Sequence, residues 1–223
     1  MTNGEWLPIS DKKSDCMSNV SKLGCFITFE GCDGSGKTTQ ARRLLGRLQR
    51  RGFDALLTRE PGGTAVGRRL RHILKRNTSM SYLAELLLFA CDRAMHVEHV
   101  LKPALESQRV VLCDRFVDST IAYQGSGRGL DLDLVQEICR VASFGLEPDL
   151  TVLLTLPPED GLKRKGISKD RFENTEISFH RRVQQAYLDL ACSQPNRWLV
   201  VDGTQTQSAI AKIIWEAVSL RLK

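Results

Sequence analysis

The fold of this chain follows from one short stretch, GCDGSGKT at residues 31–38. The stretch fits the pattern G-x-x-x-x-G-K-[ST] without a mismatch, and it stands between an apolar run, Phe26–Phe29, and a segment with helical spacing. Its glycines allow backbone N–H groups to turn inward around an anion, and the N-terminus of the following helix faces the same phosphates. The stretch therefore predicts a phosphate-binding loop between a strand and a helix.

The end of this loop carries the chemistry. Lys37 can reach the β and γ phosphate oxygens of a nucleotide, and the Thr38 hydroxyl can ligate Mg²⁺. The loop by itself indicates only a nucleoside triphosphate, because GTPases, ATPases and small-molecule kinases share it. No N-K-x-D guanine-recognition motif occurs in the sequence, which disfavours a GTPase.

Further apolar runs predict strands at Ala55–Thr58, Val110–Cys113, Leu150–Leu156 and Trp198–Val201. Most are apolar at consecutive positions, which is typical of parallel strands covered on both faces. Helical spacing predicts four helices. The first opens near Lys37, the second runs over 83–101 until Pro103 ends or kinks it, the third follows Asp131, and the last covers 210–218. The alternation predicts an α/β P-loop fold in three layers. Its five-stranded parallel sheet is flanked by helices, and ligands bind at the carboxyl ends of the strands.

The composition is that of one globular domain, with 223 residues of which 42% are hydrophobic. The net charge of 32 − 26 = +6 suits either nucleic acid or a small polyanionic substrate. No apolar stretch approaches the roughly 18 residues that a membrane span needs, so no membrane partner is expected. The seven cysteines are odd in number and lack C-x-x-C spacing. This favours a reducing, cytoplasmic location over a disulfide framework.

Two segments differ in kind from the rest of the chain. Residues 1–22 are polar and mixed in charge, so we interpret them as a flexible extension that precedes a catalytic domain at 23–223. Residues 162–174 are charged and poor in large apolar side chains, and they lie between two helical patterns. This pattern indicates a short, mobile surface segment.

Two basic runs allow a nucleic-acid face as one interpretation. They are Arg42, Arg43, Arg47, Arg50 and Arg51, and then Arg68, Arg69, Arg71, Lys75 and Arg76. Each run alternates with apolar residues at helical spacing, which is typical of a solvated outer helix face. Since no RNA- or DNA-binding motif accompanies them, no nucleic-acid partner is expected.

Two pairs of residues indicate a second substrate. Asp114 closes a predicted strand at the ligand edge, where it can hold Mg²⁺ through water, and Arg115 beside it would face a phosphate. Phe89 and Arg93 stand at i and i+4 on one helix face, which suits a base that is stacked on one side and hydrogen-bonded at its edge. The alternatives are an Asp–Arg pair that caps the strand and a phenylalanine of the core.

These motifs together resemble the bacterial thymidylate kinases. The resemblance rests on GCDGSGKTT (31–39), TREPGGT (58–64), LLLFACDR (86–93), CDRFVDST (113–120) and AYQGSGRG (122–129), and it extends from about Phe26 to Lys223. It implies the reaction MgATP + dTMP → ADP + dTDP, which serves dTTP synthesis for DNA replication. It also implies a homodimer and a lid at about 162–174.

The resemblance implies roles for residues by position. The residues expected to bind the ATP phosphates are Gly31, Cys32, Asp33, Gly34, Ser35, Gly36, Lys37, Thr38 and Thr39. Those expected to bind Mg²⁺ are Thr38 and Asp114. The residues expected to line the dTMP pocket are Asp33, Glu60, Pro61, Phe89, Arg93, Arg115, Ser119, Thr120, Tyr123 and Gln124. Within it, Phe89 would stack on thymine, Arg93 would bind the base edge, and Arg115 would hold the dTMP phosphate. Asp33 would meet the sugar 3′-hydroxyl, and Tyr123 would disfavour a 2′-hydroxyl.

Catalysis is expected to involve Lys37, Arg115 and Asp33, together with an arginine of the lid. Some thymidylate kinases place an arginine in the phosphate loop, where this chain has Gly34. The charge is therefore expected from Arg164 or Arg171. Two alternatives stay open at this point: a kinase for another nucleoside monophosphate, and a non-enzymatic nucleotide-controlled switch.

Overall fold

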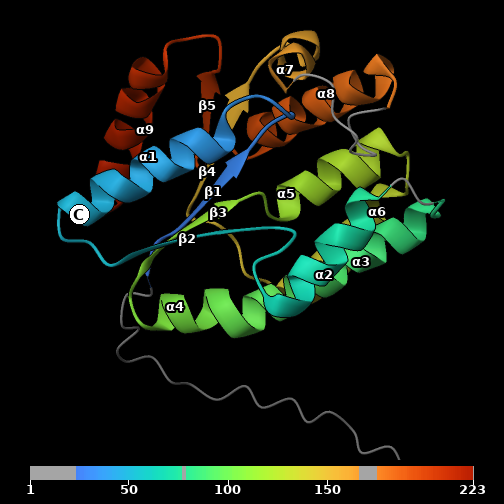
Figure 1. Cartoon of the computed structure of the whole chain (residues 1–223), viewed down its shortest axis with the longest axis horizontal. Helices are drawn as coiled ribbons and strands as arrows, with labels where there is room; N and C mark the ends of the chain where they lie inside the picture. Colours follow the sequence, from blue (N-terminus) through green and yellow to red (C-terminus); the bar gives the residue numbers. More distant parts are fainter. Residues whose placement is uncertain (1–23, 77–78, 166–174, 223) are drawn as a thin grey trace, which may run out of the picture.

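The computed structural model describes residues 24–76, 79–165 and 175–222 (Figure 1). The extension predicted at 1–22 lies outside these residues. So does most of the lid predicted at 162–174, including Arg171, while its first residues are helical.

The described residues form a parallel sheet whose strands lie in the order β2-β3-β1-β4-β5. The strands are β1 (Phe26–Glu30), β2 (Ala55–Arg59), β3 (Val110–Asp114), β4 (Leu150–Thr155) and β5 (Trp198–Asp202). Each lies within one residue of its predicted bounds, and β1, β3 and β4 are buried almost throughout, as expected for strands covered on both faces. The predicted α/β fold with a five-stranded parallel sheet is confirmed.

Helices connect the strands and cover both faces of the sheet. They are α1 (Lys37–Arg50), α2 (Ala65–Lys75), α3 (Tyr82–His96), α4 (Lys102–Glu106), α5 (Val117–Thr120), α6 (Leu132–Ser143), α7 (Pro158–Lys165), α8 (Ile177–Ser193) and α9 (Gln207–Arg221). Side-chain oxygens of Thr64, Ser81, Asp131 and Thr206 accept hydrogen bonds from the first turns of α2, α3, α6 and α9. These caps explain why the four helices begin where they do.

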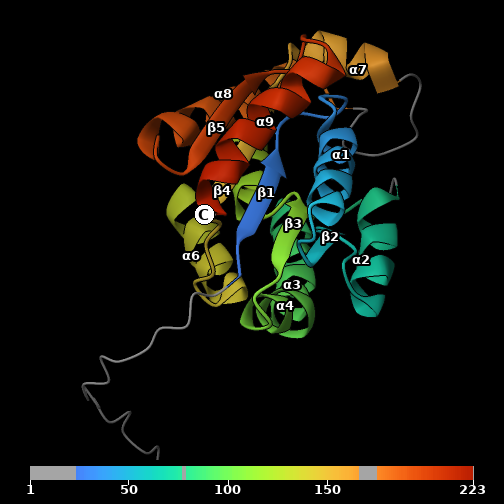
Figure 2. The same cartoon turned by 90° about the vertical axis from the view of Figure 1, so that its left-hand side faces the viewer.

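The core consists of apolar layers on the two faces of the sheet. Ile27 and Phe29 of β1 pack with α1 and α9, which lie next to each other in Figure 1. Phe26 faces the other way, toward Leu101 and Phe116 of the segments around α4 and α5. On that same side, α8 covers β4. Figure 2 shows the sheet between these layers, with the phosphate-loop end of α1 beside the tip of β1.

The helix expected over 83–101 does not end at Pro103. After α3 the chain takes a π-helical turn at Val97–Leu101, in which the Lys102 N–H reaches the carbonyl of Val97, and it continues into α4. A proline within a regular helix lacks an N–H donor, and its ring crowds the carbonyl four residues earlier. The wider turn relieves that crowding, and Pro103 then stands in the first turn of α4, where no intrahelical donor is needed.

Within the described ranges, no helix combines the length and the apolar character that crossing a bilayer would require.

Candidate active site

The predicted site residues come together at one edge of the sheet. The phosphate loop follows β1, residues 60–64 follow β2, and Arg115 follows β3, and these three strands are neighbours in the sheet. Because the strands are parallel, the segments after them lie at the same edge. Two adjoining cavities open there, which we call the loop cavity and the aromatic cavity.

The phosphate loop has the backbone that its glycines predict. Gly31, Gly34 and Gly36 have φ values of 132°, 76° and 96°, in the region that residues with side chains avoid. Gly36 stands directly before α1 and offers no side-chain cap, so the first N–H groups of the helix are left for an anion. Gly34 also lies against α7, where an added Cβ would collide with the carbonyl oxygen of Gly161.

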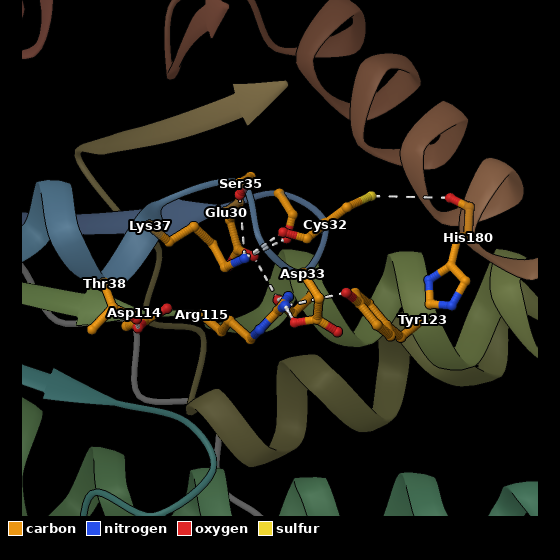
Figure 3. A network of polar contacts seen from close by, with 12 residues as sticks. Glu30, Cys32, Asp33, Ser35, Lys37, Thr38, Asp114, Arg115, Tyr123 and His180 are labelled. Carbon is orange, nitrogen blue, oxygen red and sulfur yellow. Dashed lines mark hydrogen bonds and ion pairs between the residues drawn. The ribbon is translucent and has the colours of Figure 1, made fainter. Parts of the chain in front are cut away.

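Lys37 lies at the centre of this loop (Figure 3). Its Nζ atom donates to the carbonyl oxygens of Gly31 at 2.8 Å and Cys32 at 2.7 Å. Burial lowers the pKa of the Lys37 amine to about 8, and the Arg115 guanidinium acts in the same direction. The amine is therefore still largely protonated at neutral pH, and its positive charge borders the loop cavity.

Thr38 and Asp114 meet at the same cavity. The Thr38 hydroxyl donates to the Asp114 carboxylate, and Arg59 Nη2 lies 3.7 Å from the same carboxylate oxygen. Thr38 stands in the first turn of α1 and Asp114 ends β3, so the two residues named for Mg²⁺ from the sequence lie in contact. A hydroxyl and a carboxylate are ligands of the kind that Mg²⁺ prefers.

Arg164 of α7 also borders the loop cavity. Its Nη1 atom donates to the carbonyl oxygen of Gly203 at 3.2 Å. The cavity thus has basic side chains from the loop, from the turn after β3 and from the start of the predicted lid.

All ten residues predicted for the second substrate line the aromatic cavity. Phe89 borders it and also packs against the core beneath α8. Arg93 is 1% exposed, and its guanidinium donates to Glu60 at 2.9 Å and Thr120 at 2.8 Å. Gln124 donates to Glu85 at 2.7 Å. The polar groups of this cavity are therefore held by partners behind them.

The sequence missed four residues of the aromatic cavity, namely Arg71, Leu74, Lys75 and Phe116. The interpretation of the second basic run as a solvated outer face is incomplete: Lys75 is exposed and Arg71 is half-buried, and both border both cavities. The reason is the placement of α2: Arg71 donates to the carbonyl oxygen of Pro61 at 3.0 Å, because this helix face turns toward the segment after β2. Their i, i+4 spacing was the available signal.

Arg115 lies where the two cavities meet. Its Nη2 atom donates to Asp33 at 2.7 Å and to the Tyr123 hydroxyl at 3.1 Å (Figure 3), and its Nη1 atom donates to Ser119 at 3.1 Å. Tyr187 is a further partner at 3.2 Å that sequence reasoning missed. Since Asp33 and Arg115 border both cavities, a group bound in one would adjoin a group bound in the other.

Comparisons with known proteins agree with this arrangement. The family model described as "Thymidylate kinase" matches residues 29–214. The thymidylate kinase of Synechococcus sp. (strain JA-2-3B'a(2-13)) is 49% identical over 197 residues, which cover 88% of this chain and 95% of that protein. That of Deinococcus radiodurans is 48% identical over 201 residues, covering 89% and 98%. The crystal structure of thymidylate kinase from Ehrlichia chaffeensis is similar with a TM-score of 0.73 at 32% identity, over 88% of this chain and 99% of that one.

Proposed function

This chain belongs to the thymidylate kinase family, and from that premise we propose how its own residues bind ATP and dTMP and move the phosphoryl group between them. Phosphorylation of dTMP to dTDP is the family's reaction, and it decides between the activities that the sequence left open. One observation carries the assignment of substrates: two adjoining cavities share a wall that includes Asp33 and Arg115.

The loop cavity takes the ATP phosphates. Backbone N–H groups of residues 31–39 surround the β-phosphate, and the first turn of α1 directs its positive end at it. Lys37 supplies a cation that the loop carbonyls already hold in place. This binding mode is supported by the uncapped start of α1 at Gly36.

Thr38 and Asp114 would hold the Mg²⁺ that accompanies ATP, Asp114 through water. Their oxygen atoms, in contact at the loop cavity, form a donor set that fits a hard cation shared with phosphates. When bound, the ion neutralises charge on the phosphate oxygens.

The aromatic cavity takes dTMP. Phe89 offers a ring for stacking, Arg93 a guanidinium at the base edge, and Arg115 a cation for the 5′-phosphate at the junction with the loop cavity. Asp33 would accept from the sugar 3′-hydroxyl, and Tyr123 would leave no room for a 2′-hydroxyl. The full set of polar groups lines one cavity, which supports this orientation.

In the reaction, an oxygen of the dTMP phosphate attacks the γ-phosphorus, and the bond from that phosphorus to the bridging oxygen of ADP breaks. The attacking oxygen is already ionised, so no general base is required. Catalysis then consists of positioning and of neutralising charge on the transferred group. Lys37, Arg115 and Arg164 border the loop cavity and are placed for that task.

A homodimer and a cytoplasmic location complete the proposal. The dimer is supported by apolar side chains that α2 and α3 expose, among them Ile73 at 45%, Leu83 at 47% and Leu87 at 50%. Light scattering of the purified chain would measure a mass twice that of the monomer, and a monomeric mass would contradict the dimer.

The substrate assignment is tested by ADP release with a panel of monophosphates at saturating MgATP. We expect the highest kcat/KM for dTMP. The kcat/KM for dUMP, which lacks one methyl group, should be lower by about ten- to a hundredfold. Little turnover of dGMP is expected. Equal turnover of dTMP and dGMP would contradict the proposed base pocket.

A further inference from the structure

Glu30, the last residue of β1, has no role in the reaction as described so far. Its side chain is fully buried, and a buried carboxylate is unfavourable unless hydrogen bonds compensate for lost water. Oε1 accepts from the Phe116 N–H at 2.7 Å, and Oε2 accepts from the hydroxyls of Ser119 at 2.6 Å and Tyr187 at 3.0 Å. All three donors belong to segments that surround Arg115.

The two hydroxyls connect Glu30 to the Arg115 guanidinium. A hydroxyl has one hydrogen and two lone pairs, so a hydroxyl that donates to Oε2 keeps its lone pairs for another donor. Arg115 Nη1 is that donor, at 3.1 Å from Ser119 Oγ and 3.2 Å from the Tyr187 oxygen. The carboxylate thereby orients both hydroxyls so that they present acceptors to the guanidinium.

The backbone at this turn is unusual as well. Arg115 has φ 75°, in the left-handed region that residues with a side chain seldom adopt. Glu30 binds the next N–H along the chain, that of Phe116, and so holds the turn itself. Figure 3 shows Glu30 beside Lys37 at the phosphate loop, with Arg115 pointing toward Asp33 and Tyr123. One buried carboxylate therefore constrains both the backbone and the side chain of Arg115.

We propose that Glu30 is a positioning residue for phosphoryl transfer, which holds the Arg115 guanidinium at the junction of the two cavities through Ser119 and Tyr187. The proposal rests on the role given to Arg115 above. Ionised Glu30 only accepts hydrogen bonds. An amide or a protonated carboxyl would instead present a donor, and a hydroxyl that accepted it would turn its own hydrogen toward the N–H groups of Arg115.

The ionisation of Glu30 falls near neutral pH. Burial raises its pKa to about 7, the Asp118 carboxylate acts in the same direction, and the Arg115 guanidinium opposes them. The charged and titratable groups that act on this site are Asp118 of α5, Arg115, Tyr187 of α8, Arg197 before β5 and Cys113 of β3. We therefore expect kcat/KM for dTMP to rise with pH through about 7 in the wild type.

Glu30→Gln tests the proposal. In the folded variant we expect kcat/KM for dTMP to fall by about ten- to a hundredfold, the range for a buried donor left unsatisfied. The KM for ATP should stay within about twofold, as expected for a change that acts on the acceptor side, and the rise of activity through neutral pH should disappear. Thr28→Val is the matched control: Thr28 is buried on the same strand and pairs with Thr151, so its loss should lower stability without changing the KM for dTMP.

Tyr187→Phe provides a second test that keeps the packing and leaves Glu30 two donors. We expect a several-fold loss of kcat/KM for dTMP, which corresponds to the net contribution of about one hydrogen bond. The double variant should lose less than the product of the single losses, because both act through one network. If Glu30→Gln does not fold, the loss of kcat/KM in Tyr187→Phe decides alone.

Wild-type kinetics and pH profile in folded Glu30→Gln, or wild-type kinetics in Tyr187→Phe where the former does not fold, would overturn the proposal. Arg115→Ala distinguishes a failure of the proposed role of Arg115 from a failure of the proposed role of Glu30 alone. If that variant retains activity, the role of Arg115 and the proposal for Glu30 both fail. If it loses activity while Glu30→Gln does not, only the role of Glu30 fails.

Discussion

Arg115 Nη2 lies 2.7 Å from Oδ1 of Asp33, which joins the turn after β3 to the phosphate loop after β1. Both side chains are 18% exposed, so water screens their attraction only in part. A phosphate that binds Arg115 therefore shares its guanidinium with Asp33. This pair links the two cavities, and the predictions below concern the groups on either side of it.

Phe89→Ala should weaken dTMP binding by about 1–3 kcal/mol, the usual range for loss of base–aromatic stacking. ATP affinity should hardly change, because Phe89 borders the aromatic cavity alone. Titration calorimetry with each nucleotide measures both. Phe144→Ala is a suitable control, since Phe144 is 53% exposed beyond α6. Unchanged dTMP affinity per folded molecule would assign Phe89 to the core.

Arg164→Ala should lower kcat by at least about a hundredfold at saturating ATP and dTMP. This minimum is smaller than the roughly 10³–10⁵-fold effect of an arginine that stabilises the transition state in related enzymes. Arg164 borders the loop cavity, so the loss should appear in kcat rather than in dTMP affinity. Arg181→Ala is the control, because Arg181 pairs with Glu159 at the surface. A near-normal kcat in Arg164→Ala would direct attention to Arg171, tested in the same assay.

Gly34→Ala should destabilise the phosphate loop by more than the cost of placing a side chain at a positive φ angle. Gly34 has φ 76°, and an added Cβ would collide with the Gly161 carbonyl. Gly52 provides a comparison, because its φ is 82° but nothing lies within 4 Å of an added Cβ. Gly52→Ala should therefore cost about 1–2 kcal/mol of stability with kcat unchanged. Gly34→Ala should lose more stability and most of kcat, as thermal unfolding and steady-state kinetics would reveal; equal losses would show that Gly161 gives way.

The pH dependence of stability should report on Glu30. Its pKa is raised from 4.5 to about 7 in the folded chain, so the folded state holds more protons than the unfolded state between those values. The free energy of unfolding of the wild type, relative to Glu30→Gln, should fall as pH rises from about 4.5 to about 7 and stay level above. Urea unfolding of both chains across this range measures the difference. A difference that does not vary with pH would show that Glu30 keeps an ordinary pKa.

The sequence by itself determined the local parts of this protein. Apolar runs and helical spacing placed the strands and most helices, because burial on both faces of a parallel sheet requires consecutive apolar residues. The glycines of residues 31–38 predicted the phosphate loop, since positive φ angles are a property of single residues. The ten residues named for dTMP came from the resemblance of five sequence motifs to a known family, and all of them line one cavity.

Tertiary structure alone decided how these parts meet. The packing of α2 on α3 turned Arg71 and Lys75 toward the cavities, whereas their spacing fits a solvated face equally well. The bond between Glu30 and Tyr187 joins residues 157 positions apart, and it exists because the strand order places α8 over the carboxyl end of β1. The physical reason is that periodicity specifies which side chains share a face, while the partner of that face depends on how distant elements pack.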